Sequence, residues 1–457
     1  MRKTVLVIFS CFLSLLFVPK TYGQGQDKLL GLLKEELAQQ MEELKGEEFP
    51  PYHMNYRVID VTSSVVSASF GALMNSQQYR SRTLVPQIRL GDEKLDNFRF
   101  NQMGSAMSRF QGPSVARLPL DEENNEDAVR QAIWDEVNNR YKFAVDMYQK
   151  TKAESSVNVE EEDKAPYFSE AKVEKYYEAP LPAEKMTIDM DQWAARMKEI
   201  SAVFKNHPGI MKGDAIMIYT VERRYFVNNE GTEVVQNLPY ARIMVFGETK
   251  ADDGMELPLN LSYFAYDPAD LPANDKIIAD AKEMVKTLEA LRVAPVVDPY
   301  TGPALLSGPA SGVFFHEIFG HRIEGQRMKS ESDGQTFKKM IGQFVLPEGM
   351  HVYDDPTLRK YAGEDLNGFY KYDDQGVKAE RVDGKLNDFL MTRTPIDGHP
   401  RTNGHARASD GFDPVSRQSN LVIETSNPKT PEELRHLLIE EVKKQGKEYG
   451  YFFKEVT

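Results

Sequence analysis

Two spacings of hydrophobic residues alternate along the first 300 residues, one typical of helices and the other of strands. Between residues 27 and 44, leucines and a methionine recur every three or four positions among acids and lysines, which predicts an amphipathic helix. The same spacing predicts helices over residues 127–152, 189–204 and 275–292. Each of these helices would bury one apolar stripe against another element.

Strand-like alternation fills much of the sequence between these helices. Residues 52–90 include YRVIDVTSSVVSASFG and RTLVPQIRLG, in which β-branched and aromatic residues alternate with polar ones. Residues 214–250 alternate in the same way around the turn sequence Asn228–Gly231, which predicts a hairpin. A further strand is expected in LNLSYFAYDP. Together these segments predict an antiparallel sheet with one solvated face.

A stretch rich in proline and glycine divides the chain into two expected domains. Residues 293–312, VAPVVDPYTGPALLSGPASG, hold four prolines and three glycines. Strand-like sequence resumes later, as in KAERVDGKLNDFLMTR, where Asp383–Gly384 is an expected turn. The expected fold class is α+β: a mixed α/β domain with an antiparallel sheet over residues 24–293, then a β-rich C-terminal domain over residues 294–457, opened by a helix that carries two histidines.

The first 23 residues have the layout of a secretory signal peptide. Arg2 and Lys3 precede an apolar run from Thr4 to Val18, and small residues lie before a cut after Gly23. The run is shorter than the about 20 residues of a membrane span, although an uncleaved anchor is the alternative. We therefore expect an exported protein in the periplasm, with the extracellular space as the alternative, and no membrane contact after cleavage.

Composition narrows the classes of function. Cys11 is the only cysteine, so a mature chain that begins at residue 24 cannot rely on disulfides. The formal net charge of −14 becomes −17 when Arg2, Lys3 and Lys20 leave with the signal. An acidic protein without a basic stripe repels phosphate backbones, so we expect no nucleic-acid partner.

The segment GVFFHEIFGHRIEGQ, residues 312–326, is the strongest candidate for chemistry. His316 and His321 offer two imidazole nitrogens, which are ligands that zinc accepts. Glu317 could act as general base toward water at the metal. Phe314 and Phe315 are expected to bury one side of the site, where the metal charge would then act more strongly.

The two histidines are five residues apart, whereas zinc-binding helices usually space them four apart. At about 100° per residue, positions five apart differ by about 140° on an ideal helix, so the side chains would diverge. Gly320 offers a remedy, because glycine can end the helix or widen a turn. We therefore predict a break at Phe319–Gly320. The alternative is two ordinary helix histidines that bind no metal.

The segment fits the pattern H-E-x-x-G-H-x-x-E-G, which resembles the TldD/PmbA family of metallopeptidases, historically called modulators of DNA gyrase. Two later segments, DDQGVKAERVDGKLNDFLMTR and GHARASDGFDPVSRQSNLVIE, are similar to the family's downstream strands. In the second of them, Arg417 and Asn420 match the family's Arg-x-x-Asn. The resemblance is specific over residues 302–423 and vague before them.

This resemblance implies a TldD-like subunit with His316 and His321 as zinc ligands and Glu317 as the catalytic glutamate. Glu324 matches a family position and is a candidate for supporting a ligand from behind. The implied activity is zinc-dependent hydrolysis of peptides or unfolded segments. Since members often pair a TldD-type with a PmbA-type subunit, we expect a homodimer or a heterodimer of this kind.

Two departures from the family qualify that expectation. The family's third zinc ligand is a cysteine near the C-terminus, and the sequence has none after Cys11. The chain also stops at YGYFFKEVT, within an expected strand, so we expect a truncated C-terminal domain. His351, His399 and His405 are substitute ligands in principle. The alternative function is a non-catalytic, peptide-binding subunit of a TldD/PmbA-like dimer.

Overall fold

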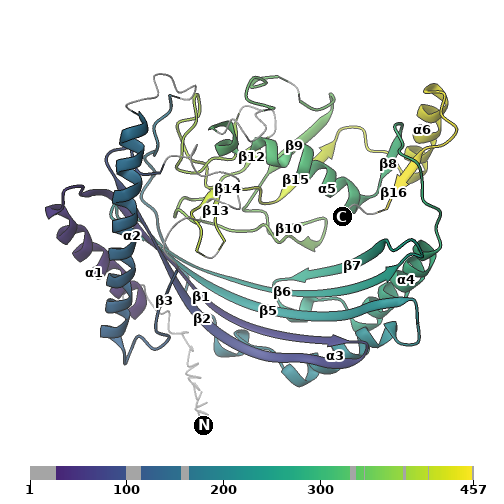
Figure 1. Cartoon of the computed structure of the whole chain (residues 1–457), viewed down its shortest axis with the longest axis horizontal. Coiled ribbons are helices and arrows are strands. Elements are labelled where there is room, and N and C mark those ends of the chain that lie inside the picture. Colours follow the sequence, from purple (N-terminus) through teal and green to yellow (C-terminus); the bar gives the residue numbers. More distant parts are fainter. Residues whose placement is uncertain are drawn as a thin grey trace, which may run out of the picture.

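One large sheet organises the computed structural model, which describes residues 27–98, 115–155, 164–329, 336–343, 345–383, 388–409 and 411–454. Its strand order is β3-β2-β1-β5-β6-β4, and β7 pairs with another stretch of β6 (Figure 1). All neighbouring strands are antiparallel except the parallel pair β4 and β6. The strands are β1 (Pro51–Ser69), β2 (Ala72–Leu90), β3 (Ala116–Arg117), β4 (Lys175–Tyr177), β5 (Ile210–Asn228), β6 (Glu233–Lys250) and β7 (Glu256–Ala265).

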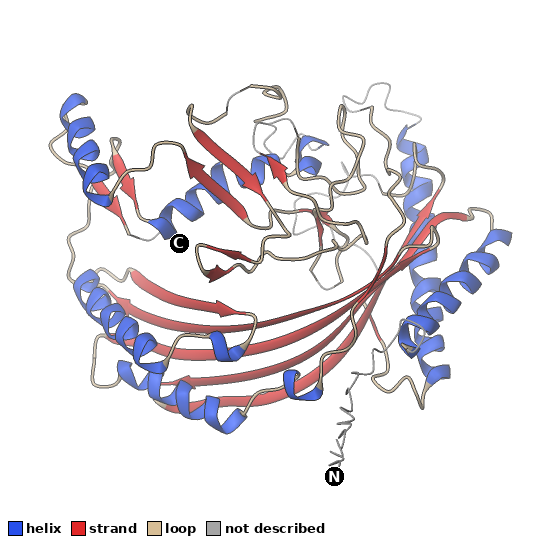
Figure 2. Cartoon of the chain, turned by 180° about the vertical axis from the view of Figure 1, so that it is seen from behind, coloured by secondary structure: helices blue, strands red, loops and turns tan. Residues whose placement is uncertain are grey.

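Four helices cover the convex face of this sheet (Figures 1 and 2). Two lie at one end, α1 (Lys28–Glu43) and α2 (Glu126–Ser155), and two at the other, α3 (Met190–Ser201) and α4 (Asn274–Arg292). Aspartates begin two of them: the Asp27 carboxylate accepts a hydrogen bond from the Leu30 amide, and Asp189 accepts one from Gln192. Helix termini and apolar stripes therefore lie where the sequence predicts them.

The two faces of the sheet differ because side chains alternate along each strand. On β6, the residues that face α3 and α4 are buried and apolar, namely Ala241, Ile243 and Val245. The residues between them lie on the opposite, concave face and include polar groups, namely Tyr240, Arg242 and Met244. The concave face is therefore free to meet the C-terminal half of the chain.

Polar contacts join that concave face to the C-terminal half, which lies within the curve of the sheet (Figure 2). The side chain of Gln236 donates a hydrogen bond to the carbonyl of Tyr372 at 2.8 Å. Farther along, the buried guanidinium of Arg393 pairs with Glu230 at 2.5 Å and donates to the Ser169 carbonyl at 2.7 Å. The two halves of the chain are thus held together by buried and specific polar pairs.

Short strands and loops make up the C-terminal half. Its core is apolar and includes Phe319, Ile323, Phe389, Leu390 and Met391. One three-stranded sheet has the order β12-β9-β15. The elements are β8 (Ala304–Leu306), α5 (Gly308–Ile318), β9 (Met350–Asp354), β10 (Lys360–Tyr361), β11 (Glu364–Asp365), β12 (Val382–Asp383), β13 (Ala406–Arg407), β14 (Val415–Ser416), β15 (Leu421–Thr425), α6 (Pro431–Lys444) and β16 (Tyr451–Phe453).

The predicted α+β fold with a large antiparallel sheet is confirmed. The strands expected in residues 378–393 are shorter than predicted, because the described residues 378–383 and 388–393 of this segment form a strand only at Val382–Asp383. Here the Asn403 side chain accepts from the Met391 amide and donates to the Phe389 carbonyl, both at 2.7 Å, so a side chain replaces a strand partner. Gly384 of the expected turn lies outside the described residues.

The predicted signal peptide and Cys11 also fall outside the described residues. Among the helices of the described part, none combines the length and the apolar character that a membrane span needs. The chain between α4 and β8 has no regular structure, which agrees with its proline content. The division into two domains near residue 293 stays a prediction.

Candidate metal centre

The helix that carries the first histidine is α5. Ser307 precedes it and accepts a hydrogen bond from the Ala310 amide at 3.2 Å, while Pro309 occupies the first turn, where no amide donor is required. The helix ends at Ile318, and a 3₁₀ helix, η7, follows over Gly320–Ile323. The predicted break at Phe319–Gly320 is therefore confirmed.

This break brings the two histidines together. The ring centroids of His316 and His321 are 4.5 Å apart, with the planes at 76°. One ligand atom of each histidine and one carboxylate oxygen of Glu317 all lie within 4.8 Å of one another. On a continuous helix the side chains of residues 316 and 321 would diverge, so the turn at residue 319 forms the cluster.

Glu324 supports His321 from behind. Its carboxylate has no exposed surface, and its Oε1 lies 3.0 Å from Nδ1 of His321. An ionised carboxylate only accepts hydrogen bonds, so this contact favours a ring proton on Nδ1, which would leave the Nε2 lone pair free for a metal. Arg327 Nη2, which can only donate, lies farther from the same Nδ1, at 3.4 Å. Glu324 thus lies behind His321, the place expected for it from the sequence, and its role toward a metal stays a prediction.

Two arginines hold Glu324 in its charged form. Arg327 Nε donates to Glu324 Oε2 at 2.7 Å, and Arg417 Nη1 lies 3.3 Å from Oε1. Burial alone would raise the pKa of the Glu324 carboxyl, but the contacts with His321, Arg417 and Arg327 outweigh burial and lower this pKa below its usual value. The carboxylate is therefore an ionised anchor for the imidazole.

The backbone around Glu324 is fixed by the C-terminal core. The amide of Leu390 donates to the Ile323 carbonyl at 2.8 Å, and the Gly325 amide donates to the Leu390 carbonyl at 2.9 Å. Gly320 lies close to another segment: a β-carbon there would lie 1.8 Å from Oε1 of Gln418, so that side chain would have to move. These contacts hold η7 against the segments around residues 390 and 418.

The first half of the cluster is open. The side chains of His316 and Glu317 are 50% and 62% exposed, and His316 Nε2 lies 3.8 Å from Glu317 Oε1. Phe315 packs partly against the core, whereas Phe314 is exposed, so the expected apolar wall is only half present. The reason is that Phe314 lies on the outward face of α5.

The side chains of His316, Glu317 and His321 are suitable zinc ligands. Two imidazoles and one carboxylate are a ligand combination that zinc uses in catalytic sites, with a fourth position for water. If Glu317 is a ligand, however, it is no longer free to serve as general base. No other His, Cys, Asp or Glu joins the cluster among the residues that the structure describes.

The three substitute histidines lie elsewhere. His351 is exposed on β9. His399 is within 3.1 Å of Asp388 and packs on the Phe389 ring. His405 is fully buried, with Nε2 3.2 Å from Asp354 and Nδ1 2.9 Å from the Asn403 side chain. None of these three histidines belongs to the cluster formed by His316, Glu317 and His321.

Sequence reasoning missed Arg327 and Gln418 as neighbours of the site. Arg327 lies three residues after Glu324, a spacing at which charged side chains meet in a helical turn, so this signal was present. Arg417 and Asn420 were singled out only by resemblance. Asn420 fixes the local fold, because its side chain accepts from the Gly368 amide and donates to the carbonyls of Asp355 and Leu358.

A comparison with known families covers the region that contains His316, Glu317 and His321. Residues 299–448 match the family described as the PmbA/TldA metallopeptidase C-terminal domain. A metalloprotease of Archaeoglobus fulgidus is 32% identical over 156 residues, which are 33% of this chain and 35% of the relative. A metalloprotease of Synechocystis sp. is 24% identical over 237 residues, which are 49% of each protein. The chain thus covers half or less of the length of these relatives.

Solved structures share the fold at low sequence identity. TldE from Thermococcus kodakarensis has a TM-score of 0.54 at 14% identity, over 88% of this chain and 79% of that one. A Thermotoga maritima protein named for modulation of a DNA gyrase has a TM-score of 0.56 at 14% identity, over 89% and 80% of the two chains. The large antiparallel sheet is therefore common to these structures. The names of the relatives imply a metal cofactor for the matched domain.

Proposed function

Because the chain belongs to the TldD/PmbA family, we propose that it is a zinc-dependent peptidase that hydrolyses peptides or unfolded segments. One observation carries the proposal: the side chains of His316, Glu317 and His321 converge although the histidines are five residues apart. The anchoring of His321 by Glu324 also supports it, because ligands of catalytic metals are oriented in this way.

His316 and His321 would hold the zinc ion through imidazole nitrogens. Zinc, when bound, supplies Lewis-acid activation of water and of the peptide carbonyl. The half-exposed Glu317 carboxylate is free to take the proton of the attacking water and to pass it to the amine that leaves. The open side of α5 is where an extended peptide reaches these groups.

The proposal is tested by hydrolysis of fluorescein-labelled casein, an unfolded protein, by the purified chain. We expect hydrolysis that a chelator abolishes and that added Zn²⁺ restores. His316→Ala and His321→Ala should each abolish it, whereas His351→Ala, a matched change at an exposed histidine outside the cluster, should leave it unchanged. Equal hydrolysis by the His316→Ala variant would overturn the proposal.

A non-catalytic, peptide-binding subunit is the second candidate function. The observation that favours it is the ligand count, since a third protein ligand other than Glu317 is not found among the described residues. The Glu317→Gln variant separates the two readings. If zinc is lost with Glu317, this glutamate is a ligand and the chain lacks a base; if zinc stays and hydrolysis stops, Glu317 is the base.

We further propose that the protein is exported, acts in the periplasm and forms a dimer with a copy of itself or with a PmbA-like subunit. Sequence features before residue 24 support the export, and the family resemblance supports the dimer. Light scattering of the chain alone, and after mixing with such a subunit, would measure the assembly. A monomer under both conditions would contradict the dimer.

A further inference from the structure

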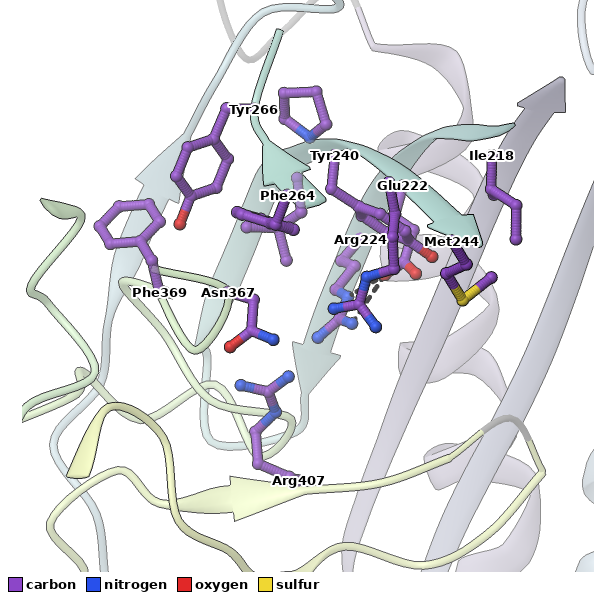
Figure 3. A pocket seen from close by; sticks show the side chains of 13 residues that line it. Ile218, Glu222, Arg224, Tyr240, Met244, Phe264, Tyr266, Asn367, Phe369 and Arg407 are labelled. Carbon is purple, nitrogen blue, oxygen red and sulfur yellow. Dashed lines mark hydrogen bonds and ion pairs between the residues drawn. The ribbon is translucent and has the colours of Figure 1, made fainter. Parts of the chain in front are cut away.

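A cavity of about 430 Å³ lies between the concave face of the large sheet and the C-terminal half (Figure 3). Its volume is within the range of about 300–1,000 Å³ that is typical of small-ligand sites. One wall is aromatic and includes Phe264, Tyr266 and Phe369. The other lining residues include three arginines and one carboxylate, namely Arg224, Arg242, Arg407 and Glu222, beside apolar residues such as Ile218 and Leu238.

The alternation of side chains along the strands creates this wall. Arg242 lies between Ala241 and Ile243, which are both buried among the helices, so its side chain points to the concave face. Arg407 lies on β13 and approaches from the C-terminal half, pointing toward Asn367 (Figure 3). The cavity is therefore lined by both halves of the chain.

The charges in the cavity are not balanced. Arg224 pairs with Glu222 at 2.6 Å and with Asp374 at 3.2 Å, so it is neutralised within the protein. Arg242 and Arg407, by contrast, form no ion pair with a carboxylate of the described residues. The Nε of Arg242 is buried and has no hydrogen-bond partner there. An unpaired buried donor is costly.

We propose that this cavity binds the C-terminal carboxylate of a peptide, with the last side chain against the aromatic wall. The planar guanidinium groups of Arg242 and Arg407 match the two oxygens of a carboxylate. The wall of Phe264, Tyr266 and Phe369 suits an apolar or aromatic side chain. Because the cavity is of small-ligand size, a chain end fits it better than a continuous strand does.

The cavity is connected to the candidate metal centre through one short hairpin. Arg407 pairs with Val415 in the ladder of β13 and β14, and Arg417, two residues later, contacts Glu324 behind His321. A ligand that orders Arg407 therefore contacts the hairpin that also supports the metal centre. The role of this cavity in holding a peptide substrate rests on the proposed peptidase function. The binding experiment that tests the cavity requires no hydrolysis.

The test measures binding without turnover. The His316→Ala background, stripped of metal, is titrated into fluorescein-labelled Ala-Ala-Ala-Phe and into the same peptide with a C-terminal amide, and anisotropy gives each Kd. We expect the free acid to bind about tenfold more tightly than the amide, which is the usual effect of one charge-assisted hydrogen bond. Arg407→Gln should reduce this ratio, and Arg242→Gln with Arg407→Gln should bring it to about one.

Arg381→Gln is the matched control, since Arg381 is half exposed and pairs with Asp383 away from the cavity; it should keep the tenfold ratio. Circular dichroism establishes that each variant is folded, and the single Arg407→Gln variant serves if the double variant is not. Equal Kd values for acid and amide, no binding of either peptide, or an unchanged ratio in the arginine variants would overturn the proposal. Zinc content and casein hydrolysis test the peptidase separately, so the two failures are distinguishable.

Discussion

The two histidines of the candidate metal centre lie in unlike surroundings. His321 is mostly buried, and Glu324 behind it has no exposed surface and is in turn paired with Arg327 and Arg417. His316 is half exposed, and its close neighbours are the ring of His321 and the exposed Glu317. One half of the centre is thus fixed by the fold, whereas the other half is open to solvent.

The difference in burial predicts different effects for substitutions behind His321 and beside His316. A side chain held by buried charges keeps its orientation without a metal, so substitutions behind His321 should change stability as well as metal affinity. A side chain in solvent contributes little to stability, so substitutions beside His316 should change chemistry alone.

Glu317→Gln should lower peptide hydrolysis by about 10²–10⁴-fold, the usual contribution of a general base. Since Glu317 is 62% exposed, the free energy of unfolding should change by less than about 0.5 kcal/mol. Casein hydrolysis and urea unfolding of the same preparations measure both. A folded variant with full hydrolysis would show that Glu317 is not the base.

Glu324→Ala should lower the free energy of unfolding by about 3 kcal/mol, because it leaves the charges of Arg327 and Arg417 without their buried partner. It should also weaken zinc binding by about 10- to 100-fold, since His321 loses the group that orients its ring. Urea unfolding and zinc titration measure these changes, with Glu317→Ala as the exposed counterpart. Equal stability of the two variants would contradict the contrast.

Asp373 is a second buried acid, and it differs from Glu324 because it lacks a strong cationic partner. Burial raises the pKa of Asp373 to about 7, and hydrogen bonds from the amides of Gln375, Val377 and Ala406 only partly offset this effect. Between pH 4 and 7 the folded state then holds a proton that the unfolded state has lost. This carboxyl therefore stabilises the fold at low pH, and its contribution declines as pH rises toward 7.

The free energy of unfolding should fall by about 1.4 kcal/mol per pH unit through this window from Asp373 alone. In Asp373→Asn this part of the slope should disappear, and the difference between the variant and the parent isolates it from other titrating groups. Urea unfolding at several pH values measures the slope. An identical slope in both proteins would mean that Asp373 is already ionised.

The smallest effect is expected at the turn itself. Gly320→Ala places a β-carbon against the end of the Gln418 side chain, which must move and lose its 3.4 Å contact with the His316 carbonyl. Since that side chain is flexible, the cost should be about 1 kcal/mol. Gln418→Ala in the same chain should relieve it. A destabilisation that persists in the double variant would place the conflict in the backbone.

Sequence patterns predicted most of the N-terminal half. The helices over residues 28–43, 126–155 and 274–292 and the hairpin at Asn228–Gly231 follow from periodicity, because long regular elements repeat their pattern many times. The C-terminal half was predicted less well. Its strands are two to five residues long, and side chains such as Asn403 replace strand partners, so no period develops.

Some features of the candidate site could likewise be predicted from local sequence, and others could not. His316, Glu317, His321 and the break before Gly320 could be predicted from one local segment. The pairing of Glu324 with Arg417 joins residues 93 positions apart, and the cavity at Arg242 and Arg407 joins two halves of the chain. Such contacts depend on tertiary packing, which no local pattern specifies.

Zinc content per chain measures whether His316 and His321 form a metal site. The purified protein, His316→Ala, His321→Ala and His351→Ala would each be dialysed against Zn²⁺ and analysed by elemental emission. We expect one zinc per chain in the parent and in His351→Ala, and none in the other two variants. A parent without zinc, or a zinc ion that both cluster variants keep, would contradict it.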